Sequence, residues 1–174
     1  MADRPFNVLS LSTGNSARSI LAECLTRELG KGKFHGFSAG SFPKGAVHPL
    51  TLHLLSEQRF STKGLRCKSW DVFAAPGAPV MDFVFTVCDE AAGEVCPVWP
   101  GQPITAIWGI PDPASSDGSE VEQMLAFRDA FGALDRRIRL FQALPFASLD
   151  RIALKREAEE IGRHGGKAAE GMTS

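Results

Sequence analysis

The sequence predicts an α/β fold, a small three-layer sandwich in which a four-stranded parallel sheet is flanked by helices. Short apolar runs alternate along the chain with segments of helical periodicity, and this alternation is typical of parallel strands joined by right-handed crossovers. The 174 residues are enough for one domain with its own core. We expect a single domain over residues 1–163, followed by a flexible, glycine-rich tail over residues 164–174.

Four short segments have the composition of buried strands, because Val, Ile, Leu and Phe gather there between turn signals. The predicted strands cover residues 6–11, 34–39, 82–87 and 104–108. Ligands of open parallel sheets bind outside the carboxyl ends of the strands. The loops that follow the first, third and fourth strands should therefore surround one crevice.

Helical periodicity fills the intervals between these strands. Ser119 and Glu122 form a capping box at the start of the longest helix, and Pro145 ends that helix. Pro49 suits the first turn of a short helix. The other helices are expected over residues 17–30, 49–55, 69–75 and 149–161.

Composition and charge exclude several classes of function. Lys and Arg number 19 and Asp and Glu 20, which gives a formal net charge of −1 and indicates neither a nucleic-acid face nor a polybasic membrane patch. No apolar segment reaches the length of a membrane span, and the first residues lack the apolar region of a signal peptide. We therefore expect a cytoplasmic protein that binds neither nucleic acid nor membranes.

A small polar loop follows the first strand and leads into the first helix, with the sequence Ser12-Thr13-Gly14-Asn15-Ser16-Ala17-Arg18-Ser19. Backbone N–H groups in such a loop can turn toward an anion, and the helix N-terminus adds positive partial charge. Arg18 adds a planar guanidinium that can hold two oxygens at once. Asn15 should hold the shape of the loop, because asparagine tolerates strained turn dihedrals. The expected ligand is a tetrahedral oxyanion.

Two cysteines, Cys88 and Cys96, bracket a short segment after the third strand. Eight extended residue steps would span about 26 Å, whereas a disulfide needs Cα atoms about 4.4–6.8 Å apart. Small residues and Gly93 would let the segment fold back. Cytosolic disulfides are mostly transient and catalytic, so redox coupling is the favoured interpretation beside an oxyanion loop. Two unrelated thiols and a zinc pair are the alternatives, although no second Cys/His pair has a fitting spacing.

A carboxylate marks the loop after the fourth strand, where Asp112 lies between Pro111 and Pro113. The prolines stiffen this loop and fix the position of the carboxylate at the expected crevice. A capped polar turn is the alternative interpretation. Elsewhere, Cys24 belongs to the apolar stripe of the first helix. The basic residues around Cys67, Lys68 among them, are expected to face solvent, with the anion as the alternative.

The loop STGNSARS resembles the phosphate-binding loop of the low-molecular-weight tyrosine phosphatases and of the arsenate reductases built on the same scaffold. In both, a cysteine, five residues and an arginine make the loop, and Ser12 stands where that cysteine is expected. The segments VCDEAAGEVCPVWPGQP and WGIPDPA resemble the redox and acid segments of the thioredoxin-coupled reductases. The resemblance covers nearly the whole chain, from Phe6 to about Ile161, and implies the phosphatase-like fold.

The resemblance implies that a thiol relay reduces arsenate. A thiolate at position 12 attacks arsenate held by Arg18 and the loop amides, and Asp112 protonates the leaving hydroxyl. Cys88 then attacks the adduct, arsenite leaves, and Cys96 finally forms a disulfide with Cys88. An external thioredoxin, glutaredoxin or small thiol restores the dithiol form. The resemblance implies no bound metal or organic cofactor.

Serine at position 12 removes the attacking sulfur from this scheme. A serine hydroxyl is far less acidic than a thiol and cannot form a disulfide, even with Ser19 donating a hydrogen bond to it. Because serine is nearly isosteric with cysteine, the loop should still fold and bind oxyanions. We expect this chain to be inactive through an engineered substitution, with a natural inactive relative as the alternative.

Two other functions remain open. One is a low-molecular-weight protein tyrosine phosphatase, but the chain has no tyrosine to line a phenol slot. The other is a non-catalytic oxyanion-binding domain in which Ser12 is natural.

Some members of the family that the chain resembles hold a potassium ion near the loop. Asn15, Glu23 and Ser38 match three of its ligands, but Trp70 stands where an aspartate is expected. We therefore predict no metal site.

Overall fold

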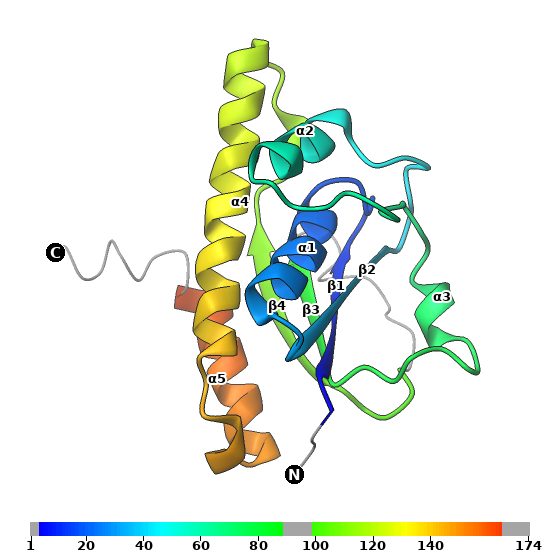
Figure 1. The fold of residues 1–174 in the computed structure, drawn as a ribbon, viewed down its shortest axis with the longest axis vertical. Coiled ribbons are helices and arrows are strands. Elements are labelled where there is room, and N and C mark those ends of the chain that lie inside the picture. The colour runs from blue at the N-terminus through cyan, green and yellow to red at the C-terminus, as the bar shows by residue number, and fades with distance from the viewer. Residues whose placement is uncertain (1–3, 89–98, 165–174) are drawn as a thin grey trace, which may run out of the picture.

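The predicted strands form one parallel sheet in the computed structural model, which describes residues 4–88 and 99–164 (Figure 1). The strand order is β2-β1-β3-β4, and all three pairings are parallel. The carboxyl ends of the strands therefore share one edge, and the predicted fold class is confirmed. The strands are β1 (Phe6–Ser12), β2 (Phe34–Gly40), β3 (Phe83–Cys88) and β4 (Ile104–Ile110).

Helices cover the two faces of the sheet unequally (Figure 1). The helices are α1 (Arg18–Gly30), α2 (Pro49–Glu57), α3 (Asp71–Ala74), α4 (Glu120–Gln142) and α5 (Arg151–His164), with the 3-10 turns η2 (Pro113–Ser115) and η3 (Phe146–Ser148). On the more heavily covered face, α1, α4 and α5 pack on the sheet and α2 packs on α4. Aromatic rings fill this interface. Trp108 stacks on Phe85 at a centroid distance of 3.9 Å, and Phe141 meets both rings edge-on.

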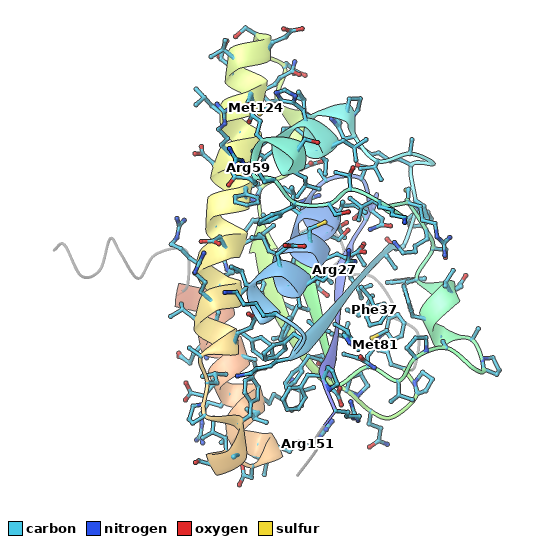
Figure 2. The ribbon with its side chains drawn as sticks, viewed as in Figure 1. Arg27, Phe37, Arg59, Met81, Met124 and Arg151 are labelled. Atoms are coloured by element: carbon cyan, nitrogen blue, oxygen red, sulfur yellow. The ribbon has the colours of Figure 1, made fainter. Side chains whose placement is uncertain are left out.

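A smaller apolar cluster covers the opposite face, beneath α3. Phe37 and Met81 lie on this side of the sheet (Figure 2). The indole rings of Trp70 and Trp99 meet edge to face there, with centroids 6.5 Å apart. Together the two clusters give the sheet an apolar layer on each face, as the alternation of β1 side chains requires.

The backbone of β2 packs closely against α1 and against the oxyanion loop at two glycines, Gly36 and Gly40. A Cβ at Gly36 would lie 2.3 Å from the carbonyl oxygen of Glu23 in α1, and a Cβ at Gly40 would lie 2.6 Å from that of Thr13. Gly40 also donates its N–H to the carbonyl of Lys68 and accepts from the N–H of Trp70. The end of β2 is therefore the point where the oxyanion loop and the segment before α3 come together.

Most predicted elements lie within one to three residues of the observed ones. The predicted capping box is confirmed, with hydrogen bonds in both directions between Ser119 and Glu122. Strand β4 extends beyond its predicted end to Ile110, which pairs with Cys88 after an irregularity in register. Apart from His164, the predicted tail lies outside the described residues. No described helix is long and apolar enough to cross a membrane.

Candidate active site

The loop between β1 and α1 lines a cavity of about 190 Å³ at the carboxyl edge of the sheet. Residues 12–18 form its wall, together with Phe42, Lys44 and Asp112. Helix α1 starts at Arg18, and its N-cap residue Ala17 has no side chain that caps the helix. An oxyanion in the cavity could therefore accept hydrogen bonds that a capping side chain would otherwise take.

The hydroxyl at position 12 takes part in two hydrogen bonds inside the wall of this cavity. Ser19 Oγ lies 2.6 Å from Ser12 Oγ, and the backbone N–H of Asn15 donates to Ser12 Oγ over 3.2 Å. The Asn15 amide donates to Ser19 Oγ over 2.8 Å and leaves the hydroxyl hydrogen of Ser19 available to an acceptor at position 12. A negatively charged atom at position 12 could therefore accept from both the Asn15 N–H and the Ser19 hydroxyl, which would stabilise the charge.

Asn15 holds the loop through its backbone and its side chain. Its φ of 48° lies in the left-handed region, which asparagine adopts more readily than most residues. Its amide group donates to Ser19 and, over 3.0 Å, to Ser38, and its carbonyl oxygen accepts from the backbone N–H of Lys68 over 2.8 Å. The amide thus ties the loop to α1, to β2 and to the segment before α3.

A charge cluster around the buried Glu23 continues from Ser38. Ser38 Oγ donates to Glu23 over 2.5 Å, and Arg27, labelled in Figure 2, pairs with the same carboxylate over 2.6 Å. The ammonium of Lys68 lies 3.9 Å from Glu23 Oε1. Burial lowers the pKa of Lys68, and the charge of Glu23 opposes that change. The expectation that Lys68 faces solvent is therefore wrong, because a carboxylate inside the fold draws the ammonium inward.

These two cations also decide whether a potassium ion fits beside Glu23. Arg27 and Lys68 already compensate the carboxylate, so the residues present do not fit an additional cation there. Among the described residues, no group of three or more His, Cys, Asp or Glu side chains could hold a metal ion.

Arg18 and Asp112 face one another across the cavity. Arg18 is 4% exposed, donates to the carbonyl of Ile110 over 2.9 Å, and lies 3.7 Å from Asp112 Oδ2. The other carboxylate oxygen of Asp112 accepts from the backbone N–H of Ala114 over 2.9 Å and caps the turn η2. The added length of β4 explains the hydrogen bond from Arg18 to the carbonyl of Ile110, because it brings Ile110 to the edge where Arg18 lies.

The cysteines differ in how they relate to the loop. Cys88 ends β3, is fully buried, and its sulfur lies 3.6 Å from Thr13 Oγ1. Cys96 lies outside the described residues. Cys24 lies in the core, as predicted, and burial raises the pKa of its thiol to about 12, which makes it a poor nucleophile.

Comparison with known families agrees with this geometry. The model of the family described as low molecular weight phosphotyrosine protein phosphatase matches residues 7–153. The chain belongs to this family. An arsenate reductase from Halalkalibacterium halodurans is 30% identical over 131 residues, which cover 75% of this chain and 91% of that protein.

Solved structures described as arsenate reductases share the fold. One, described as an arsenate reductase in the phosphate binding state, has a TM-score of 0.64 at 26% identity and covers 79% of this chain and 97% of its own. Another, a thioredoxin-dependent arsenate reductase of Corynebacterium glutamicum, has a TM-score of 0.57 at 24% identity and shares the fold. The match covers 80% of this chain but only 61% of that protein.

Three residues beside the phosphatase-family loop were not predicted from the sequence. Phe42 and Lys44 donate their backbone N–H groups to the carbonyls of Thr13 and Gly14, over 2.9 and 3.1 Å. The thiol of Cys67 donates to the same Gly14 carbonyl over 3.1 Å. The topological argument applied to the other strands could have found the first two, because they follow β2, whose carboxyl end lies beside that of β1.

Proposed function

We propose that this scaffold reduces arsenate to arsenite through a cysteine thiol/disulfide relay on its oxyanion loop. The observation that carries the proposal is the contact between the loop and a buried thiol, Cys88, at the end of the neighbouring strand. A hydrolytic phosphatase needs only a nucleophile, an arginine and an acid, whereas a reductase also needs a second sulfur close to the first. The reductases among the relatives support the same assignment.

The relay requires a cysteine in place of Ser12. Its thiolate would bond to arsenic as Asp112 protonates the departing hydroxyl, while Arg18 and the loop amides hold the remaining oxygens. The Cys88 thiolate would then attack the sulfur at position 12. The sulfur–sulfur bond forms as the sulfur–arsenic bond breaks, and its electron pair reduces arsenic(V) to arsenic(III), which leaves as arsenite.

Regeneration requires two further exchanges. Cys96 would attack Cys88, releasing the thiolate at position 12 and leaving a Cys88–Cys96 disulfide. An external dithiol of the thioredoxin or glutaredoxin class, or a small thiol, would reduce that disulfide by two electrons. The C. glutamicum relative described as thioredoxin-dependent favours the first of these. Such reductants operate in the cytoplasm, where we propose that the chain acts.

The chain with Ser12 binds oxyanions in this proposal but does not turn them over. Ser12 Oγ is held by hydrogen bonds with Ser19 and the Asn15 N–H, yet an oxygen cannot replace sulfur in either disulfide. We propose that Ser12 is a substitution of the nucleophile, with a natural oxyanion-binding relative as the alternative. The codon at position 12 in the source gene distinguishes the two.

The test restores the sulfur. The Ser12→Cys variant should reduce arsenate when thioredoxin, thioredoxin reductase and NADPH are supplied, and adding Cys88→Ser should abolish turnover. The parent chain, with Ser12, is the matched control and should show none. Parallel assays with glutaredoxin and with a small thiol identify the reductant. Hydrolysis of an aryl phosphate by Ser12→Cys without arsenate turnover would overturn the reductase assignment.

One observation favours tyrosine phosphatase activity as a second candidate. Phe42 lines the cavity and is 71% exposed, so its ring could contact an aryl group at the mouth. In that case Cys88 and Cys96 would be incidental, and Cys88→Ser would leave aryl phosphate hydrolysis by Ser12→Cys unchanged.

A further inference from the structure

The segment after β2 fixes a lysine at the mouth of the oxyanion cavity. The backbone N–H groups of Phe42 and Lys44 bond to successive carbonyls of the loop, at Thr13 and Gly14. Lys44 is therefore held beside the loop by its own main chain, although it lies far from the loop in sequence. Both residues line the same cavity as Arg18.

The side chain of Lys44 lies across Gly14. A Cβ built on Gly14 would come within 3.0, 3.2 and 3.1 Å of Cγ, Cδ and Cε of the lysine. Three successive carbons of the lysine thus run along the loop, where a side chain at position 14 would obstruct them. Lys44 forms no ion pair with any residue that the structure describes.

The positive charge of Lys44 affects the pKa of a neighbouring histidine, His48. Burial lowers the pKa of His48, the positive charge of Lys44 lowers it further, and the negative charge of Asp112 raises it. Lys44 and Asp112 are thus both close enough to influence one ring beside the cavity. The ammonium therefore belongs to the electrostatic environment of the oxyanion site.

We propose that Lys44 is the second cationic group of the oxyanion site and selects tetrahedral anions with two negative charges over those with one. Arg18 alone does not provide this selection, because it carries one positive charge and Asp112, which lies 3.7 Å from it, adds none whether or not it holds a proton. The proposal rests on the proposed oxyanion site and names its substrate class. A small inorganic dianion, as arsenate is at slightly alkaline pH, fits this charge balance.

The contribution of Lys44 should depend on the charge of the anion. Lysine is a hydrated point charge on a flexible stem, and Lys44 is an exposed residue, whereas Arg18, which lines the same cavity, is buried. Coulombic attraction scales with the charge of the ligand, so a dianion loses more than a monoanion of the same shape when the ammonium is removed. Added salt should reduce the difference.

The test uses calorimetric titration of the chain with Ser12, at low ionic strength, with sulfate as the dianion and perchlorate as the tetrahedral monoanion. Lys44→Met keeps the apolar stem and removes the charge, and Lys44→Arg keeps a charge. We expect Lys44→Met to weaken sulfate binding about threefold to tenfold and perchlorate binding by about twofold at most, with Lys44→Arg close to the parent. Lys33→Met, which removes an exposed charge just before β2 at the opposite edge of the sheet, is the matched control and should change neither.

The outcomes separate this inference from the site on which it rests. Equal losses for the two anions in Lys44→Met, or no loss for sulfate, would overturn the role of Lys44 while leaving the oxyanion site intact. Failure of the parent chain to bind either anion, or equal binding by an Arg18→Ala variant, would overturn the oxyanion site itself and the proposal with it.

Discussion

Asn15 allows a quantitative test of how the oxyanion loop is held. Replacing it with alanine places a residue with a Cβ, but no local hydrogen bonds, at a φ of 48°. The left-handed conformation then costs about 1–2 kcal/mol. The backbone N–H of Lys68 loses its acceptor, which adds about 1–2 kcal/mol for a partly buried donor. We therefore expect Asn15→Ala to lower the free energy of unfolding by about 2–4 kcal/mol.

Asn15→Gly separates the two contributions. Glycine adopts a positive φ without the steric penalty but also lacks the amide, so only the loss of the hydrogen bonds remains. Asn15→Gly should unfold with a free energy about 1–2 kcal/mol above that of Asn15→Ala. Urea denaturation followed by circular dichroism measures both values. Equal stabilities for the two variants would refute the argument from backbone conformation, and an Asn15→Ala variant as stable as the parent would refute both.

Loss of the Asn15 amide should also change the pKa of a thiol at position 12. Because the Asn15 amide donates to Ser19 Oγ, which is hydrogen-bonded to position 12, loss of the amide leaves Ser19 free to turn. In a chain that also carries Ser12→Cys, we expect Asn15→Gly to raise the pKa of the new thiol. The pH dependence of its alkylation rate, measured against a variant without Cys88, gives that pKa. An unchanged value would show that Ser19 is oriented by other contacts.

Four further predictions concern the site and the core. In Ser12→Cys, Asp112→Asn should slow arsenate turnover about 10²- to 10⁴-fold in kcat while sulfate still binds, and an unchanged kcat would exclude Asp112 as the acid. In the same background, Phe42→Ala should leave arsenate kcat/KM within about twofold if the substrate is a small inorganic anion, whereas a larger loss would indicate an aryl or peptide substrate. Because the pKa of His48 is lowered in the folded chain, the unfolded chain binds more protons, and the free energy of unfolding should fall as the pH drops below the ordinary histidine range. His48→Asn should reduce this pH dependence in denaturation curves measured at several pH values. An unchanged dependence would assign it to another group. Phe141→Ala should cost about 3–5 kcal/mol in urea denaturation, because this buried ring packs against several others, and a loss below about 1 kcal/mol would show that the core collapses into the space.

The elements that the sequence predicted well are those with local signals. The four strands and the capping box at Ser119 follow from short stretches of residues whose neighbours in sequence are also their neighbours in space. The end of β4 was predicted too early, because Gly109 and Pro111 read as the start of a loop although Ile110 between them still pairs. That error matters for the site, since Arg18 binds the carbonyl of Ile110.

The residues that were missed reach the site from distant segments. Lys68 looks like part of a solvated basic stretch, and only the fold brings its ammonium against Glu23. Lys44 and Phe42 belong to an irregular connection with no periodicity, and their roles depend on hydrogen bonds to a loop on another strand. Sequence patterns report local periodicity and local turn chemistry, so contacts of this kind are visible only when the strand order is known.

The close approach at Gly40 has a consequence for how this chain can vary. Edge strands usually accept many substitutions, because they pair with only one neighbouring strand and their free side faces solvent. At Gly40 even a methyl group would collide with the carbonyl of Thr13, and the backbone of the same residue is engaged by the segment before α3. Close packing against the oxyanion loop therefore restricts this position of the edge strand to glycine. In a library of random variants, loss of anion binding should map to Gly40 as often as to the loop itself, although this residue has no side chain to offer a ligand.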